Sequence, residues 1–152
     1  MDIRITAQSF DPSAECAAFM AGRADAGALV SFVGTCRNET AGRAVTRLTI
    51  DHYDGFTQKE IARLAGEVAE RFAVADLLVI HRVGPIEPGE AIVLVAGLST
   101  HRADAFEAVK VLMDYLKTDA PLWKKETGPD GARWIEPRAE DHARRAAAET
   151  ST

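Results

Sequence analysis

The sequence predicts one α+β domain, and three patterns lead to this prediction. Short apolar runs bounded by glycine and proline are typical of strands. Two longer stretches carry apolar residues at helical spacing. The predicted order, β-α-β-β-α-β-β-α-β-β, mixes both element types in one unit without a linker or repeat. At 152 residues, the chain is long enough to bury a core. We expect a single domain over residues 1–138 and a polar tail over residues 139–152.

The N-terminal part predicts a strand followed by a short helix. Ile3 and Ile5 alternate with polar neighbours, which is the pattern of a half-buried strand. Asp11 precedes Pro12, an N-cap acceptor followed by proline at the first helical position. The helix that begins there is expected to end near Gly22.

Two further strands are predicted in the first third of the chain. Residues 28–36 are almost continuously apolar, so we expect both faces of this strand to be covered. Residues 38–42 are polar and predict a loop. Residues 45–53 follow as another strand.

The first long helix has a predicted start and a predicted buried face. Thr57 and Glu60 have the spacing of a capping box, and Phe56 with Ile61 has that of a hydrophobic staple. The apolar residues at helical spacing are Ile61, Leu64, Val68 and Phe72. This spacing predicts a helix with one face in the core.

Two strands and a second long helix are predicted next. Residues 77–83 and 91–98 are predicted strands joined by a turn rich in glycine and proline over residues 84–89. Ser99 or Thr100 is the expected cap of the helix. Its predicted core stripe is Phe106, Val109, Met113 and Leu116, and Pro121 ends it.

The C-terminal part predicts a hairpin and a tail. Residues 122–127 and 133–136 flank Gly128-Pro129-Asp130-Gly131, which is a hairpin signal. After Pro137 the side chains are short or charged, so we expect a frayed helix.

Composition excludes several classes of function. A net charge of −5 argues against nonspecific nucleic-acid binding, which needs a basic face. No apolar run is long enough to cross a bilayer and no leader is recognisable, so we expect no membrane contact and a cytoplasmic location. Cys16 and Cys36 have neither disulfide-framework nor metal-site spacing, so no metal or bound cofactor is expected. Motifs for nucleotide binding are absent from the sequence.

The most informative stretch contains two lysines on either side of a predicted turn. Lys117 falls in the last turn of the helix, where it can simply complement the helix dipole. Lys124 lies on the next strand, where it can be an ordinary exposed lysine. Alternatively, the turn at Pro121 brings both to one pocket. Two neighbouring ammonium groups lower each other's pKa, which makes one of them a proton donor or acceptor near neutral pH.

Other cationic residues are candidates for binding an anion. Arg37 follows a predicted core strand. It is either an ordinary surface charge or a residue whose planar guanidinium binds an anion. His101 and Arg102 stand at a helix start, where free N–H groups and positive side chains favour phosphate. Cys36 is interpreted as inert, with a persulfide carrier as the alternative. The pair His81-Arg82, at the end of a strand, is interpreted as structural.

Beyond these signals, the chain resembles the large subunit of molybdopterin synthase from Gly27 to Arg138. The resemblance rests on several motifs in the right order and spacing. They are residues 32–37, 48–53 with Gly55, 80–84, 88–90, 101–102, 105–108, 113–117, 121–126 and 133–134.

The resemblance implies an α/β hammerhead-like fold with an additional antiparallel β subdomain. It also implies a homodimer within a heterotetramer, in which each copy receives the C-terminal Gly-Gly tail of a small ubiquitin-like subunit. The tail, activated as a thiocarboxylate, would be the sulfur donor. The substrate would be cyclic pyranopterin monophosphate, which becomes the dithiolene of the molybdenum cofactor.

Site residues are also implied by the resemblance. Lys117 matches the essential lysine of the family and Lys124 its second active-site lysine. The substrate-binding set, which includes both lysines, adds Thr35, Cys36, Arg37, His101, Arg102, Lys125 and Glu126. Valine is commoner in the family at the place of Cys36, which favours a pocket wall. Two alternatives remain: a sulfurtransferase that depends on Cys36, and a catalytically silent member that only binds a pterin or a partner.

Helix geometry adds an expectation about assembly. His101 and Lys117 lie 16 positions apart at opposite ends of one predicted helix. A rise of about 1.5 Å per residue separates them by roughly 24 Å, about twice the length of a pterin monophosphate. We therefore expect His101 and Arg102 of one copy to complete the pocket that holds Arg37, Lys117 and Lys124 of another.

Overall fold

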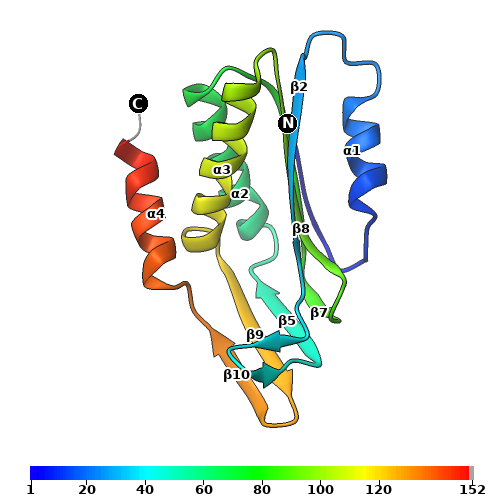
Figure 1. The fold of residues 1–152 in the computed structure, drawn as a ribbon, viewed down its shortest axis with the longest axis vertical. Coiled ribbons are helices and arrows are strands. Elements are labelled where there is room, and N and C mark those ends of the chain that lie inside the picture. The colour runs from blue at the N-terminus through cyan, green and yellow to red at the C-terminus, as the bar shows by residue number, and fades with distance from the viewer. Residues whose placement is uncertain (151–152) are drawn as a thin grey trace.

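A computed structural model describes residues 1–150 as two four-stranded sheets, a two-stranded β3–β4 hairpin and four helices (Figure 1). The helices lie around the sheet with the longer strands, called the larger sheet below. The elements are β1 (Asp2–Thr6), α1 (Pro12–Met20), β2 (Ala28–Thr35), β3 (Glu39–Thr40), β4 (Arg43–Ala44), β5 (Arg47–His52), α2 (Phe56–Arg71), β6 (Val74–Arg82), β7 (Gly84–Ile86), β8 (Ala91–Ser99), α3 (Arg102–Thr118), β9 (Leu122–Gly128), β10 (Gly131–Ile135) and α4 (Ala139–Thr150). The predicted α+β class is confirmed, and the order agrees with the prediction apart from the short strands β3, β4 and β7.

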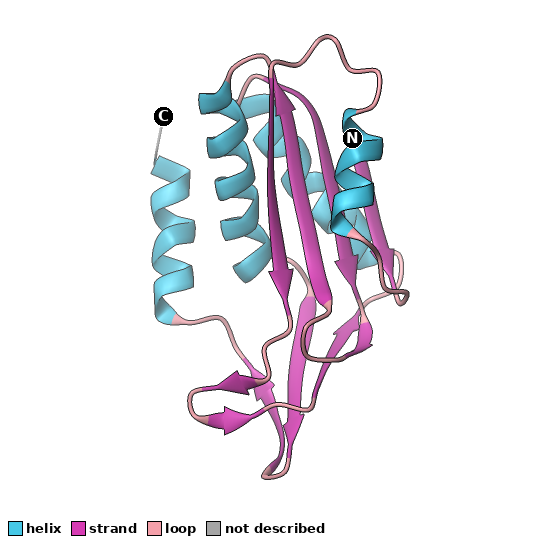
Figure 2. Ribbon diagram, turned by 45° about the vertical axis from the view of Figure 1, so that its right-hand side comes forward, coloured by secondary structure: helices cyan, strands magenta, loops and turns pink. Residues whose placement is uncertain are grey.

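The larger sheet has the strand order β1-β6-β8-β2, in which only the β1–β6 pair is parallel. Successive side chains of its two central strands point to opposite faces of the sheet, and the side chains on both faces are buried. Leu77 and Val79 of β6 face α2 and α3, whereas Leu78 and Ile80 face the side of α1. Figure 2 shows this layering, with α1 on one side of the sheet and the other helices opposite.

The smaller sheet lies below the larger one in Figure 1 and is antiparallel, in the order β10-β9-β5-β7. Leu48 and Ile50 of β5 pack with Cys36, Val83 and Ile86 in a small apolar cluster. This cluster joins the two sheets, because Cys36 follows β2 and Val83 follows β6. The predicted additional antiparallel unit is therefore present.

The expectation that β2 is covered on both faces is wrong. The strand forms one edge of the larger sheet and pairs on one side only, with β8. Phe32 is 42% exposed and Val33 is 39% exposed. Their side chains point to opposite faces, so neither face of the middle of β2 is covered within this chain.

The long helices begin differently from the predicted caps. Gly55, with a positive φ of 74°, is the N-cap of α2, so the expected capping box is not formed. Thr57 instead lies inside the helix and is fully buried. Its hydroxyl accepts a hydrogen bond from the Tyr53 N–H (2.9 Å) and donates one to the Pro121 carbonyl (3.0 Å). His101, not Ser99 or Thr100, is the N-cap of α3.

The buried face of α3 is also shifted from the predicted stripe. Val109 and Leu116 are buried as expected, but Phe106 is 59% exposed. The residues that pack are Ala105, Ala108, Val109, Val111, Leu112, Tyr115 and Leu116. A Cβ added at Gly97 of β8 would lie 3.2 Å from the Val109 side chain, so small residues on both elements allow a close approach.

The segment after Pro137 forms a helix that packs against α3. The Arg145 guanidinium lies 3.9 Å from the centre of the Tyr115 ring and pairs with Asp119 at 2.8 Å. Ala148 is 3% exposed. This packing does not match the expectation of a frayed tail, because one face of α4 is tied to α3; the division at residue 138 stays a prediction. Across residues 1–150, no helix is both long and apolar enough to span a membrane.

Candidate functional site

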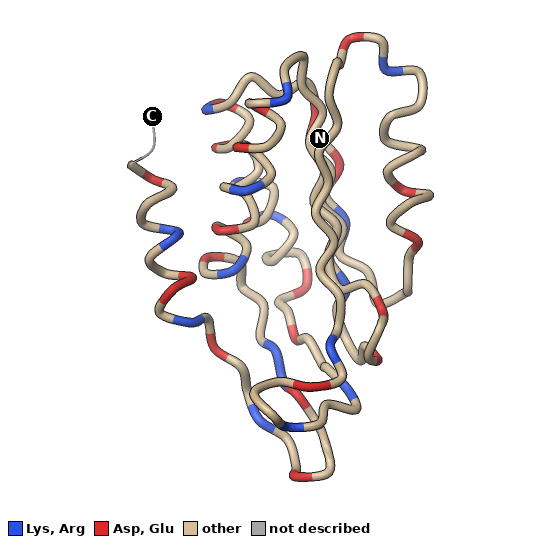
Figure 3. Tube along the Cα trace, in the orientation of Figure 1, with Lys and Arg blue, Asp and Glu red and all other residues tan. Residues whose placement is uncertain are grey.

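A cavity of about 830 Å³ opens where the larger sheet meets the smaller one. Its walls come from the end of β2, the lower end of α3, β9 and the start of α4. Figure 3 shows lysine and arginine positions in these segments. The predicted site residues that line the cavity are Thr35, Cys36, Arg37, Lys117, Lys124 and Glu126. The folded chain therefore brings together most of the predicted set.

Lys117 and Lys124 meet at the cavity because of the turn between them. Helix α3 ends at Thr118 and β9 begins at Leu122. The Pro121 carbonyl accepts the hydrogen bond from Thr57, which anchors the turn to α2. Asp119, held by Arg145, anchors the same turn to α4. The predicted juxtaposition of the two lysines is thus fixed from two sides.

The two lysines differ in their surroundings. Lys117 is exposed at the cavity wall, whereas Lys124 is partly buried on β9. Burial, and secondarily the positive charge of Lys117, lowers the pKa of Lys124 to about 8, while Asp141 acts in the opposite direction. A lysine in this state exchanges protons near neutral pH, whereas an ordinary lysine stays charged.

Arg37 is placed by the main chain of the residue before it. The register between β2 and β8 shifts at Gly34 and Thr35, which turns the strand end away from the sheet. The Cys36 N–H donates to the Glu90 carbonyl (2.9 Å), and the Gly89 N–H donates to the Cys36 carbonyl (2.8 Å). The exposed Arg37 follows this anchored residue at the cavity wall.

Cys36 is 6% exposed and belongs to the apolar cluster between the sheets. Burial raises its pKa, and the negative charges of Glu126 and Glu90 raise it further. A protonated, buried thiol is a poor nucleophile. This environment favours the interpretation of Cys36 as a wall residue.

Glu126 is held by side chains of the protein. One carboxylate oxygen accepts a hydrogen bond from the Thr40 hydroxyl (2.9 Å), and the other accepts one from Arg133 (3.3 Å). These bonds tie the β3–β4 hairpin to the smaller sheet. A Cβ added at Gly128 would lie 2.1 Å from the Ala44 carbonyl oxygen, so the hairpin also rests directly on the β9 main chain.

Lys125 is not brought to the cavity. Successive side chains of a strand point to opposite faces, so it lies on the face of β9 opposite Lys124 and Glu126. Its ammonium stands 5.4 Å from the centre of the Trp134 ring, on the neighbouring strand.

His101 and Arg102 are not brought to the cavity of their own chain either. They are exposed at the N-terminal end of α3, and Lys117 lies at the other end. The helix runs unbroken from Arg102 to Thr118, about 24 Å at 1.5 Å per residue. Figure 2 shows its two ends at opposite levels of the larger sheet.

Several cavity residues have no assigned role in the sequence analysis. The polar ones include Thr40 of the hairpin, Arg138 just before α4, and Glu140, Asp141, His142 and Arg144 at its start. Their contribution depends on long-range packing, such as the contact between Arg145 and Asp119, and no local pattern encodes it. Across residues 1–150, no group of three or more histidine, cysteine or acidic residues is arranged to hold a metal ion.

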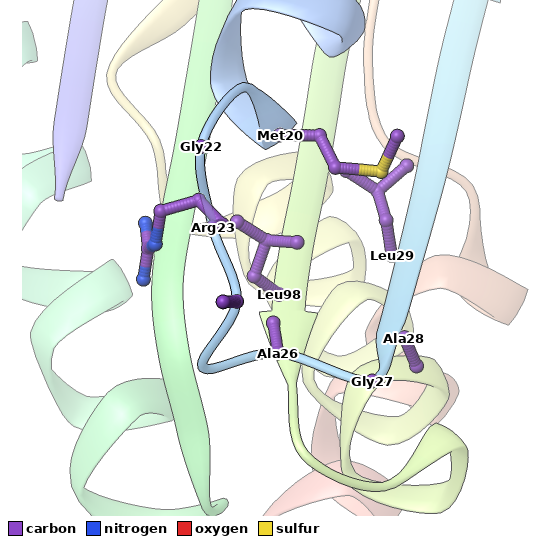
Figure 4. A pocket seen from close by; sticks show the side chains of 9 residues that line it. Met20, Gly22, Arg23, Ala26, Gly27, Ala28, Leu29 and Leu98 are labelled. Carbon is purple, nitrogen blue, oxygen red and sulfur yellow. The ribbon is translucent and has the colours of Figure 1, made fainter.

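A second hollow, of about 510 Å³, lies far from this cavity, between the segment after α1 and the start of β2 (Figure 4). Small or apolar side chains line most of it, including Met20, Ala26 and Leu29. The charged residue in its lining is Arg23, whose guanidinium pairs with Asp25 and Asp76 at 2.9 Å. Such a lining offers no group for proton transfer, so the first cavity is the candidate site.

Comparisons with known proteins identify the family of this chain. The profile of the MoaE protein family matches residues 5–119. The molybdopterin synthase catalytic subunit of Mesorhizobium japonicum is 51% identical over 91% of this chain and 87% of its own. That of Caulobacter vibrioides is 49% identical over 93% of both chains. The solved molybdopterin biosynthesis MoaE protein of Burkholderia ambifaria superposes with a TM-score of 0.82 at 43% identity, covering 99% of both chains. The chain therefore belongs to the MoaE protein family.

Proposed function

We propose that this chain is the catalytic subunit of a molybdopterin synthase. It transfers sulfur from the C-terminal thiocarboxylate of a small ubiquitin-like carrier to cyclic pyranopterin monophosphate, and two transfers give the dithiolene. The observation that carries this proposal is the pairing of Lys117 with a partly buried Lys124 in one cavity beside Arg37. Membership of the MoaE family supports the same reaction.

The cavity residues have complementary parts in this reaction. Arg37 binds the phosphate of the pterin through its planar guanidinium. The Lys117 ammonium contacts the carbonyl oxygen of the carrier's tail or donates a proton as the cyclic phosphate opens. Lys124 is the proton acceptor, because a lysine with a pKa of about 8 is partly neutral at physiological pH. Thr35 and Glu126 shape the wall.

In this proposal the sulfur arrives on the carrier, so the chain needs no cysteine nucleophile and no bound cofactor. The raised pKa and burial of Cys36 support this division of labour. The carrier's Gly-Gly tail is narrow enough to enter the cavity, because glycine has no side chain. We place this chemistry in the cytoplasm.

A second copy of the chain completes the pocket. His101 and Arg102 lie at the far end of α3 from Lys117, yet the family resemblance assigns all three to the substrate. The exposed Phe32 and Val33 on the edge strand β2 offer an apolar surface for self-association. A dimer of this chain with two carriers makes a heterotetramer.

Reconstitution tests the reaction. The purified chain is mixed with a thiocarboxylated carrier and cyclic pyranopterin monophosphate, and the dithiolene product is measured. The matched control is the same carrier with an ordinary C-terminal carboxylate, which should give no product. Absence of product from the thiocarboxylate with a folded chain would contradict the proposal and leave a silent binding protein. Product that requires the Cys36 thiol would instead favour the cysteine-dependent alternative.

Complementation tests the shared site. Arg102→Ala and Lys117→Ala proteins should each be inactive, and mixing them should restore part of the activity. In a randomly exchanged heterodimer one of the two pockets is wholly wild-type. Absence of complementation despite demonstrated subunit exchange would show that each site is built within one chain.

A further inference from the structure

An ion pair between a buried arginine and a partly exposed glutamate lies beside the strand end that carries Arg37. The Arg82 side chain is 6% exposed, and its guanidinium pairs with the Glu90 carboxylate at 3.0 Å. A second nitrogen of the same guanidinium donates to the Pro85 carbonyl at 3.3 Å. Arg82 does not line the cavity, so it is not placed to touch the substrate.

The ion pair fixes the turn between β7 and β8. The Glu90 carboxylate also accepts the Glu87 N–H at 2.8 Å, and the Glu90 N–H donates to the Glu87 carbonyl at 3.1 Å. Arg82 therefore holds both ends of the segment from Pro85 to Glu90 through two nitrogens of its planar guanidinium. Such a turn would otherwise sample several conformations, since glycine stands at position 89 with a φ of 89°.

The same turn holds the main chain of Cys36. The Glu90 carbonyl accepts the Cys36 N–H, and the Gly89 N–H donates to the Cys36 carbonyl, so both peptide groups of Cys36 are held by the turn. Arg37 is the next residue, and the position of Cys36 fixes where its main chain begins. The side chain of Arg37 then reaches the cavity wall from this fixed point.

We propose that Arg82 is a positioning residue for Arg37, acting through Glu90 and the main chain of Cys36. This role rests on the proposed function, in which Arg37 binds the phosphate of the pterin. Loss of this ion pair should weaken substrate binding while leaving proton transfer by Lys117 and Lys124 intact, because the turn between these two residues is anchored separately, by α2 and α4. The effect should therefore fall on KM rather than on kcat.

The test compares variants at the Arg82–Glu90 ion pair with a matched pair elsewhere. Arg82→Met and Glu90→Ala should each raise KM for the pterin substrate by about tenfold, the scale of one hydrogen bond to a charged group. In both variants kcat should stay within about twofold of wild type. Glu90→Gln keeps an acceptor oxygen for Arg82 and for the Glu87 N–H, so it should restore most of the affinity. Arg23→Met removes a partly exposed ion pair with Asp76, far from the cavity, and should leave KM unchanged.

A double-mutant cycle separates positioning from general destabilisation. In an Arg37→Ala background, Arg82→Met should raise KM no further, because the residue it positions is gone. Additive effects of the two changes, or a loss of kcat with unchanged KM, would overturn the proposal. Should Arg82→Met fail to fold, Glu90→Ala in the same cycle distinguishes the same two outcomes, because Glu90 is partly exposed and its loss is better tolerated.

The positioning role of Arg82 can be tested even if the proposed function is wrong. If the wild-type chain makes no dithiolene with an active carrier, the proposed reaction is wrong. Calorimetric titration with inorganic phosphate then measures the effect of the ion pair on Arg37. Arg37→Ala, Arg82→Met and Glu90→Ala should weaken phosphate binding alike, and Glu90→Gln should not. Equal phosphate affinity in the wild type and in the Arg82 and Glu90 variants would overturn the positioning role.

Discussion

The central strands of the larger sheet are covered on both faces, whereas strand β9 of the smaller sheet runs along the cavity. In the larger sheet, every residue from Leu77 to Ile80 of β6 is at most 1% exposed. In the smaller sheet, no residue of β9 is fully buried. A buried position on a central strand of the first sheet can hold an ionisable group without penalty only when that group is paired, as Arg82 is, whereas the partly exposed β9 can carry unpaired ones. The larger sheet therefore contributes most of the buried core, and the smaller sheet carries ionisable residues of the candidate site.

The largest expected effect is on activity, at the end of α3 that faces the smaller sheet. Lys117→Ala should reduce dithiolene formation by a factor of at least about 100, the typical contribution of a proton-transferring group. Its melting temperature should stay close to wild type, because Lys117 is exposed. Product formation is measured alongside thermal unfolding. Near-normal turnover would show that chemistry at this cavity does not depend on Lys117.

The next effect is on stability, in the larger sheet. Leu94→Ala should lower the free energy of unfolding by about 2–5 kcal/mol, because Leu94 is fully buried and leaves a cavity. Lys125→Ala in the smaller sheet is the matched comparison. It removes a contact with the Trp134 ring worth about 0.5–1 kcal/mol. Denaturant unfolding measures both variants. Equal losses of unfolding free energy in the two variants would contradict the difference in burial between the two sheets.

A smaller effect concerns the titration of Lys124. Its pKa is about 8 in the folded chain and 10.5 without the fold. Between these values the unfolded chain binds more protons, so the contribution of Lys124 to the free energy of unfolding rises with pH from about 8 to about 10.5. Lys124→Met should lose this rise. Lys117→Met should move the pKa of Lys124 upward, which NMR of labelled lysine side chains can follow. An unchanged pKa would mean that the two ammonium groups do not interact.

The smallest expected effect is at the junction of the two sheets. Cys36→Val should leave turnover unchanged and cost less than about 1.5 kcal/mol, because the volumes are similar. Turnover and unfolding are measured on the same preparation. Loss of activity in a well-folded Cys36→Val protein would revive a sulfur carrier on this cysteine.

The two central strands of the larger sheet and the helix α2 were predictable from the sequence because their signals are local. The stripe of Ile61, Leu64 and Val68 on α2 is fully buried, as its spacing predicts. Phe106 on α3 does not follow this rule, because the buried face of α3 includes the small residues Ala105 and Ala108 and approaches Gly97 through Ala105 and Val109. A pattern that weighs large apolar residues misses a helix packed through small ones.

The site was predictable in part for a similar reason. Lys117 and Lys124 flank one turn, so their meeting follows from the local sequence around Pro121. The residues of α4 are held at the cavity by the contacts of Arg145 with Tyr115 and Asp119. Asp119 lies 26 positions before Arg145, so no local pattern reveals this contact. Strand alternation, applied to residues 122–128, would have placed Lys125 away from Lys124 and Glu126 without a structure.

The close approach of the main chain at Gly128 limits which amino-acid substitutions this position tolerates. Any side chain there would collide with the Ala44 carbonyl oxygen, and the main chain of β4 cannot yield as a flexible side chain can. Substitution would lift the β3–β4 hairpin and withdraw the Thr40 hydroxyl from Glu126. A saturation library at this position should therefore yield folded proteins with an altered cavity rim, and only glycine should survive a selection for function.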